Sequence, residues 1–350
     1  MQFGPASWQT RLLNVISAVF IRPVLGALTL LGLMINRISP AVLQRARLDV
    51  IDAPMRLLRP LRGTTVTPSR LPDCPAEWVI APGVGQGERS DGKIGQGERS
   101  DGKNPDDGPV IIYFHGSALV TLGLNTYRRF ASKLSAATGA RVFNVGYRLA
   151  PLASIEEAVS DGLEAYRFVL ATGVPPERIV FAGDSAGGLI AADTAIAARD
   201  AGLPVPAGQV LLSALTSADM ELKYLAIKDH FDVLFPASTV RFIYDVFATV
   251  NGTRDVPVMP AETNMTGLGP FLLQVGTHEM LRNDTFVLAD QLAAHGVPVW
   301  VQVWDRTMHM FQLQFDVNPD AVRAIAEIAS FVDHVTAVGR NQADREEASA

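Results

Sequence analysis

One serine of this 350-residue chain lies at the centre of a Gly-x-Ser-x-Gly pentapeptide, Gly183-Asp184-Ser185-Ala186-Gly187. The apolar run RIVF comes directly before it, and the small-residue segment AGGLIAADTAIAARDAG, which has a helical pattern, begins at Ala186. A strand, a sharp turn and a helix in this order present a serine hydroxyl at the edge of a sheet, and the helix start offers free N–H groups to a developing oxyanion. We therefore interpret Ser185 as the nucleophile of acyl transfer and Ala186 as one donor of the oxyanion hole.

A second candidate segment, His115-Gly116-Ser117, follows directly after the strand-like run PVIIYF at 109–114. In enzymes built around such a serine turn, a loop at this place directs backbone N–H groups toward the nucleophile. We expect the N–H groups of Gly116 and Ser117 to complete the oxyanion hole. His115 is interpreted as an organiser of this loop, because the general base should follow the nucleophile in the chain order Ser, acid, His.

That order predicts an acid after the run PFLLQVG at 270–276 and a histidine after the run VPVWVQVW at 297–304. Both positions are filled, by Glu279 and by His309. We expect His309 to be the general base, and Glu279 to fix the tautomer of its imidazole and stabilise the imidazolium that forms.

Three other side chains compete for these roles. Asp284 begins the helical pattern DTFVLADQLAAH, where a carboxylate is common because it stabilises a helix N-terminus. Asp305 follows the last strand-like run on the same short loop as His309 and is better placed to orient that loop. His278 neighbours the acid loop but precedes the last strand-like run. Glu279 is the preferred acid, and Asp284 is the alternative.

The elements that must position these residues alternate between short β-rich runs and helical patterns, which is typical of parallel strands joined by crossover helices. Several runs are apolar at consecutive positions, as expected for strands covered on both faces. The predicted strands are 77–82, 109–114, 140–147, 178–183, 208–213, 270–276 and 297–304. The predicted helices are 125–136, 155–171, 186–201, 284–295 and 321–338.

Three segments fall outside this alternation. Residues 84–108 contain the nonapeptide GQGERSDGK twice in tandem, which is rich in Gly and charge and predicts a flexible surface loop. Residues 214–267 are too long for a simple crossover and carry large apolar groups at helical spacing, which predicts a helical lid. Residues 339–350 lack apolar groups, and we expect a disordered tail there.

The N-terminal segment 1–70 includes two apolar runs, 12–21 and 24–35, on either side of Arg22-Pro23. A single membrane span would place the arginine and a helix breaker near its middle, and the arginine alone costs about 2.5 to 3.5 kcal/mol there. A signal peptide is disfavoured because hydrophobicity resumes after the proline. We expect a pair of helices that either pack over the catalytic domain or rest at a lipid surface.

The overall composition excludes several classes of function. Hydrophobic residues make up 48% of the chain and charged residues 19%, and the net charge of −6 gives no bulk attraction to nucleic acid. The single cysteine, Cys74, cannot form an intramolecular disulfide, and no Cys/His cluster has the spacing of zinc ligands. We therefore expect neither a metal nor a nucleic-acid partner.

Taken together, the motifs resemble the hormone-sensitive-lipase-like branch of the α/β-hydrolase esterases over roughly residues 75–338. The segments on which this resemblance rests are YFHGSALV (113–120), YRLAP (147–151), GDSAGG (183–188), QVGTHEML (274–281) and MHMFQ (308–312). The resemblance implies a mostly parallel eight-stranded sheet flanked by helices, a helical cap, a Ser-acid-His triad and no cofactor. The chain departs from the usual HGGG or HGGA at Ser117 and Ala118, and from the common aspartate at Glu279.

The predicted activity is a serine carboxylesterase or lipase-like hydrolysis of apolar acyl esters through an acyl-enzyme, with a small apolar ester or lipid as substrate. Lactone or amide hydrolysis by the same triad remains an alternative. A non-catalytic ligand-binding protein on a hydrolase scaffold is an alternative of another class. We expect a cytoplasmic protein in which residues 12–35 can contact a membrane peripherally.

Overall fold

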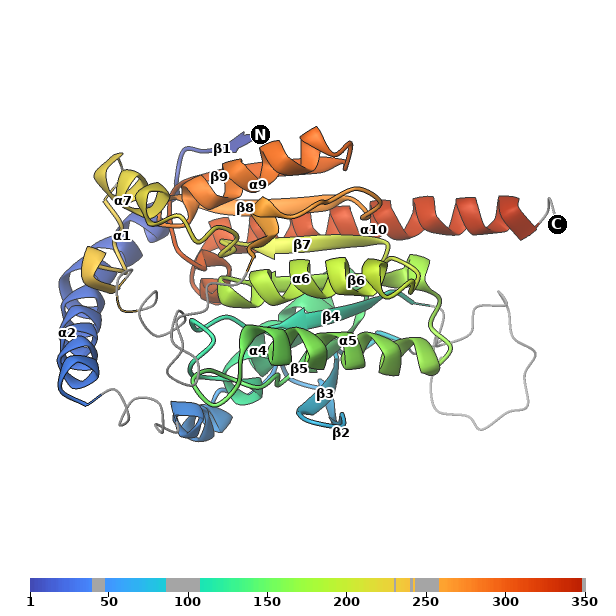
Figure 1. Ribbon diagram of the computed structural model, residues 1–350, viewed down its shortest axis with the longest axis horizontal. Coiled ribbons are helices and arrows are strands. Elements are labelled where there is room, and N and C mark those ends of the chain that lie inside the picture. Colours follow the sequence, from blue (N-terminus) through green and yellow to red (C-terminus); the bar gives the residue numbers. More distant parts are fainter. Residues whose placement is uncertain (40–47, 86–107, 230, 240–241, 243–257, 348–350) are drawn as a thin grey trace.

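A nine-stranded sheet with helices on both faces forms the centre of the molecule (Figure 1). The structure, a computed structural model, describes residues 1–39, 48–85, 108–229, 231–239, 242 and 258–347. The strand order is β1-β9-β8-β7-β6-β4-β5-β3-β2, and β3 is antiparallel to both of its neighbours whereas all other pairs are parallel. The strands are β1 (Gln2–Phe3), β2 (Thr65–Arg70), β3 (Pro75–Ile80), β4 (Val110–Phe114), β5 (Arg141–Val145), β6 (Ile179–Asp184), β7 (Gly208–Leu212), β8 (Phe271–His278) and β9 (Val299–Met308).

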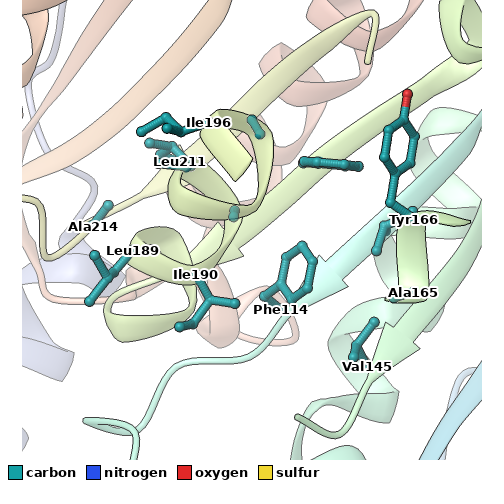
Figure 2. Close-up of a cluster of buried hydrophobic side chains, with 14 of the residues drawn as sticks. Phe114, Val145, Ala165, Tyr166, Leu189, Ile190, Ile196, Leu211 and Ala214 are labelled. Carbon is teal, nitrogen blue, oxygen red and sulfur yellow. The ribbon is translucent and has the colours of Figure 1, made fainter. Parts of the chain in front are cut away.

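The central strands are buried on both faces because their side chains alternate between two cores. In β4, Ile112 and Phe114 point into one core and Ile111 and Tyr113 into the other, and all four are fully buried. Figure 2 shows the first core, where Phe114 lies among residues of the neighbouring helices. Burial of each such side chain stabilises the fold by about 1.5 to 3 kcal/mol.

The helices of the central domain lie on the two faces of the sheet according to which core they supply. Buried residues of α4 and α10 join one core, and those of α5, α6 and α9 join the other. A capping box between Ser154 and Glu157 begins α5. The bounds are α4 (Leu124–Thr138), α5 (Ile155–Ala171), α6 (Ala186–Asp200), α9 (Arg282–Ala294) and α10 (Pro319–Glu347).

The sheet has one strand more than the eight implied by the resemblance. Gln2 and Phe3 form β1, which pairs in parallel with β9, and the Phe3 ring stacks on Trp304 with centroids 4.3 Å apart. A strand of two residues is too short to produce a periodic sequence signal. For residues 1–70 only helices were predicted, so that β1 was missed, as was β2 at the opposite edge of the sheet.

The N-terminal apolar segment forms one continuous helix instead of the expected pair. α1 (Trp8–Ile16) leads through a π-helical turn (Ser17–Ile21) into α2 (Arg22–Ile38). Pro23 lies in the first turn of α2, and the wider π turn before it lets the helix continue where a regular α-helix would break.

Three further expectations concern the tail, the lid and the duplicated loop. The tail expected to be disordered over 339–350 is helical through Glu347, since its Gln, Ala, Arg and Glu residues are good helix formers that extend an existing helix. The expected lid, 214–267, contains α7 (Met220–Asp229), but residues 230, 240–241 and 243–257 lie outside the described chain. Most of the duplicated loop, 86–107, also lies outside it.

Candidate active site

Ser185 occupies the turn between β6 and α6. Its backbone has φ 51° and ψ −120°, a conformation that residues with a side chain rarely adopt. Its N–H donates to the carbonyl of Leu212 on β7 at 2.8 Å, and its carbonyl accepts the N–H of Leu215 at 2.9 Å. These bonds hold the strained turn, so that the serine faces a cavity while the residues on either side of it are buried.

The two glycines of the pentapeptide are required by close backbone contacts. A Cβ on Gly183 would lie 2.2 Å from the carbonyl oxygen of Gly187, and a Cβ on Gly187 would lie 2.1 Å from the carbonyl oxygen of Phe114. Neither backbone group can move without breaking β4 or the first turn of α6. The glycines therefore let the serine turn pack against the end of β4, where the oxyanion loop begins.

His309 and Glu279 meet across the ends of β9 and β8. Nδ1 of His309 lies 2.7 Å from Oε2 of Glu279, and both side chains are buried. The other carboxylate oxygen, Oε1, accepts the hydroxyl of Ser213 at 2.8 Å and the N–H of Gly276 at 2.5 Å. With Nδ1 hydrogen-bonded to the carboxylate, Nε2 is the ring nitrogen left to exchange a proton in the cavity.

Charges around His309 determine the direction of its pKa shift. Burial lowers the pKa of His309. The hydrogen bond and the charge of Glu279 raise it, and the charges of Asp232 and Asp184 raise it further. The net effect is a pKa above the ordinary value of histidine. Burial raises the pKa of Asp232 itself to about 6. Asp232, which lies in the segment 214–267, accepts the N–H of Met280, the residue after Glu279, at 2.8 Å.

The competing residues point elsewhere. Asp284 is fully buried in a salt bridge with Lys223 at 2.8 Å and accepts the N–H groups of Thr216 and Ser217. Asp305 accepts the N–H of Ala6 at 3.1 Å, outside the cavity. His278 contacts the hydroxyl of Thr277 at 3.0 Å. Only Glu279 among the candidate acids is hydrogen-bonded to His309 in the part of the chain that the structure describes.

The loop after β4 places the predicted oxyanion donors differently from the expectation. The N–H of Gly116 donates to Oδ1 of Asp184 at 2.9 Å, so that Gly116 is not free to bind an oxyanion, contrary to the sequence analysis. Ser117 and Ala118 line the cavity with Ser185, as does Ala186 at the start of α6. Ala118 stands at the third glycine position of the HGGG pattern but was not among the site residues predicted from the sequence.

This loop has positive φ at three consecutive residues with side chains, namely 82° at Ser117, 58° at Ala118 and 60° at Leu119. Each such conformation costs about 1 to 2 kcal/mol for a residue other than glycine. The strain is held in place by packing and hydrogen bonds, including one from the N–H of Ala150 to the carbonyl of Leu119 at 2.7 Å. At Ser117 and Ala118, the glycines of the usual motif would adopt the same backbone without this cost.

Asp184 and His115 organise the loop from behind. The carboxylate of Asp184 accepts the hydroxyls of Tyr113 at 2.5 Å and Tyr127 at 3.0 Å, and burial raises its pKa to about 6. The His115 ring stacks on Tyr147 with centroids 4.6 Å apart, and burial lowers the pKa of His115 to about 4. His115 is therefore neutral at pH 7, which agrees with a structural role.

Ser185 and His309 share one cavity of about 640 Å³. Its walls are mostly apolar and come from the central domain, from the segment 214–267 (the lid segment, named for the lid predicted there) and from the N-terminal helix. Phe235 of the lid segment packs against the His309 ring with centroids 5.3 Å apart. Leu25, Leu28 and Ile35 of α2 line the cavity, and the sequence did not predict this contribution. Among the described residues, no group of three or more His, Cys, Asp or Glu side chains could hold a metal ion.

Comparisons with known proteins identify relatives of the chain. The sequence matches a family described as having the alpha/beta hydrolase fold over residues 111–313. Esterase LipU of Mycobacterium tuberculosis is 32% identical over 295 residues, which cover 82% of this chain and 93% of that protein. Carboxylesterase/phospholipase LipF of the same organism is 33% identical over 305 residues, covering 83% and 74%. The crystal structure of an esterase from the bacterial hormone-sensitive lipase family has a TM-score of 0.70 and 28% identity, covering 81% and 89%.

Proposed function

The chain belongs to the hormone-sensitive-lipase-like branch of the α/β-hydrolase family and is an esterase- or lipase-like carboxylic ester hydrolase, and from this premise we propose that Ser185, His309 and Glu279 form its catalytic triad. The observation that carries the assignment is the 2.7 Å contact between Glu279 and His309 in the wall of the cavity that Ser185 also lines. A serine on a strained turn, a buried imidazole and a buried carboxylate together have the chemistry of acyl transfer.

In the proposed mechanism, Nε2 of His309 removes the hydroxyl proton of Ser185 as Oγ attacks the ester carbonyl. Glu279 keeps the proton on Nδ1 and stabilises the imidazolium that forms. His309 then protonates the alcohol as it leaves, and a water molecule attacks the acyl-enzyme by the same route to release the acid and regenerate Ser185.

We assign the oxyanion hole to the backbone N–H groups of Ser117, Ala118 and Ala186. All three residues line the cavity beside Ser185, and Ala186 is the first residue of α6, where backbone N–H groups have no partner within the helix. Donors held in place before the reaction stabilise the charge that develops on the carbonyl oxygen.

The substrates are esters or lipids, and we propose that their acyl part is apolar. Leucine, isoleucine, methionine and phenylalanine side chains make up most of the cavity wall, so that an alkyl chain would be stabilised by leaving water.

For its location, we propose a cytoplasmic protein with peripheral membrane contact through residues 12–35. The N-terminal helix Trp8–Ile38, which is long and apolar enough for such contact and little buried by the rest of the chain, supports this proposal.

The test combines covalent labelling with an assay of chain-length preference. Wild-type protein should react with a fluorophosphonate probe and hydrolyse p-nitrophenyl esters, and Ser185→Ala should do neither. Labelling or more than a few per cent of the activity in the alanine variant would show that another residue is the nucleophile. Hydrolysis of p-nitrophenyl esters from acetate to dodecanoate then measures the acyl chain that the cavity accepts.

A further inference from the structure

The N-terminal helix is apolar on the side that faces away from the rest of the protein. Figure 1 shows α2 at one end of the molecule, opposite the end that holds the C-terminus. Ten large apolar side chains of the helix Trp8–Ile38 are more than half exposed: Trp8, Val15, Val19, Phe20, Val24, Leu28, Leu30, Leu31, Met34 and Ile38. Exposed apolar surface of this extent is uncommon unless a partner covers it.

The exposed surface continues into the candidate cavity. Leu28 and Leu31 of α2 and Ile51 of the neighbouring 3-10 segment Leu48–Leu57 line the cavity, although they are 59%, 52% and 44% exposed. These residues therefore form part of the rim where the cavity meets the apolar surface. A molecule embedded in whatever covers this surface would reach the rim without crossing bulk water.

The charge of the same region indicates an anionic partner. Residues 1–62 contain eight arginines, two aspartates, and neither lysine nor glutamate, so that their net charge is +6. Because the whole chain has a charge of −6, residues 63–350 carry −12. Arg11, Arg37 and Arg56 are exposed in this basic segment. Exposed apolar residues combined with arginines are typical of helices that lie in the interface of a membrane with anionic lipids.

Attachments along the helix favour a surface position over a membrane span. The hydroxyl of Thr10 donates to Asp320 at 2.6 Å, and the hydroxyl of Thr29 is 3.0 Å from that of Thr239, with all four residues buried. A span would have to break both contacts and place Arg22 within the hydrocarbon. The helix is bound to the domain at these polar positions, while its exposed apolar side chains face outward.

We propose that an anionic lipid bilayer covers the outer face of the helix Trp8–Ile38 and that the cavity takes its ester substrate directly from that bilayer. The proposal rests on the proposed esterase function for the identity of the cavity. To the peripheral membrane contact proposed above it adds the anionic charge of the lipid and the route of the substrate.

The test uses the full chain and a variant, Phe20→Ser/Val24→Ser/Met34→Ser, whose three sites do not line the cavity. Wild type should sediment with vesicles of phosphatidylcholine and phosphatidylglycerol, and less with phosphatidylcholine alone or at high salt. The triple variant should bind at least tenfold more weakly. A matched control, Val317→Ser/Val322→Ser/Val338→Ser, removes exposed apolar groups elsewhere and should bind like wild type.

Activity separates substrate delivery from chemistry. The triple variant should hydrolyse p-nitrophenyl acetate in solution at the wild-type rate and a long-chain ester in anionic vesicles at least tenfold more slowly. Ser185→Ala should lose both activities but keep vesicle binding, so that failure of the proposed triad and failure of the membrane proposal give different results.

Three outcomes would overturn the proposal. The first is equal vesicle binding by wild type and triple variant. The second is a wild-type dimer that the triple variant converts to monomers without any vesicle binding, since a second copy would then cover the helix. The third is resistance of vesicle-bound protein to extraction at alkaline pH, which would indicate a span.

Discussion

The carboxylate of Asp184 accepts the backbone N–H of Gly116 at 2.9 Å, which connects the residue before the proposed nucleophile to the loop that holds two proposed oxyanion donors. Asp184→Asn should disturb this loop, because the amide cannot accept hydrogen bonds on both of its polar atoms. We expect kcat to fall about tenfold or more with little change in KM. The control Asp161→Asn alters another buried carboxylate, paired with Arg148, and should affect the melting temperature more than kcat. Equal kcat in wild type and Asp184→Asn would exclude the positioning role.

Glu279→Gln tests the triad acid. The amide cannot support the imidazolium of His309, so that kcat should fall about 1,000-fold or more while the melting temperature changes little. Asp284→Asn should have the opposite effect, because it leaves the buried Lys223 ammonium without its charge partner. We expect Asp284→Asn to cost about 3 kcal/mol of unfolding free energy, more than a lost helix cap alone would cost. Steady-state kinetics and thermal denaturation of both variants would reveal a reversed assignment.

The pH dependence of kcat/KM should report His309. The imidazole must be neutral to accept the serine proton, and its pKa is raised from 6.5, so that kcat/KM should rise with pH through an inflection above 6.5. Asp232→Asn removes a negative charge that raises this pKa and should move the inflection to lower pH. A wild-type profile that is flat between pH 5 and 9 would be incompatible with His309 as the base.

Ser117→Gly should keep or increase activity. Glycine adopts φ of 82° without strain, and the relief of about 1 kcal/mol offsets its greater freedom in the unfolded chain. Ser117→Pro should lose about 100-fold or more, since proline has no N–H and its φ is near −65°. The hydroxyl of Ser117 lies 3.3 Å from that of Tyr127. A glycine variant with a loss as large as that of the proline variant would show that this hydroxyl contact matters.

Phe235→Ala should change chain-length preference. Its ring packs against His309 and lines the cavity, so that its loss should raise KM for octanoate esters more than for acetate esters. Tyr224→Ala, an exposed residue of α7 that does not line the cavity, is the control and should leave both values unchanged. Equal increases for the two esters in Phe235→Ala would mean that the lid segment does not select the acyl chain.

The sequence by itself determined those parts of the protein that depend on neighbours along the chain. Apolar strands, the glycines around Ser185 and the helix after it are local patterns, and they predicted most central strands, the serine turn and the order of the proposed triad. The missed elements include β1, which is too short for a periodic signal, the edge strand β2, and the helix that continues through Pro23.

Contacts between distant segments were decided only by the tertiary structure. Asp184, which is 68 residues from Gly116 in the chain, accepts the N–H of Gly116, and we therefore propose Ala118 as a donor in place of Gly116 beside Ser117. Lys223 binds Asp284 from a distance of 61 residues, which leaves Glu279 as the carboxylate beside His309. α2 becomes a wall of the cavity although no local pattern relates it to Ser185. Such pairings depend on how packed elements meet, and hydrophobic periodicity specifies which face of an element is buried but not which residue it meets there.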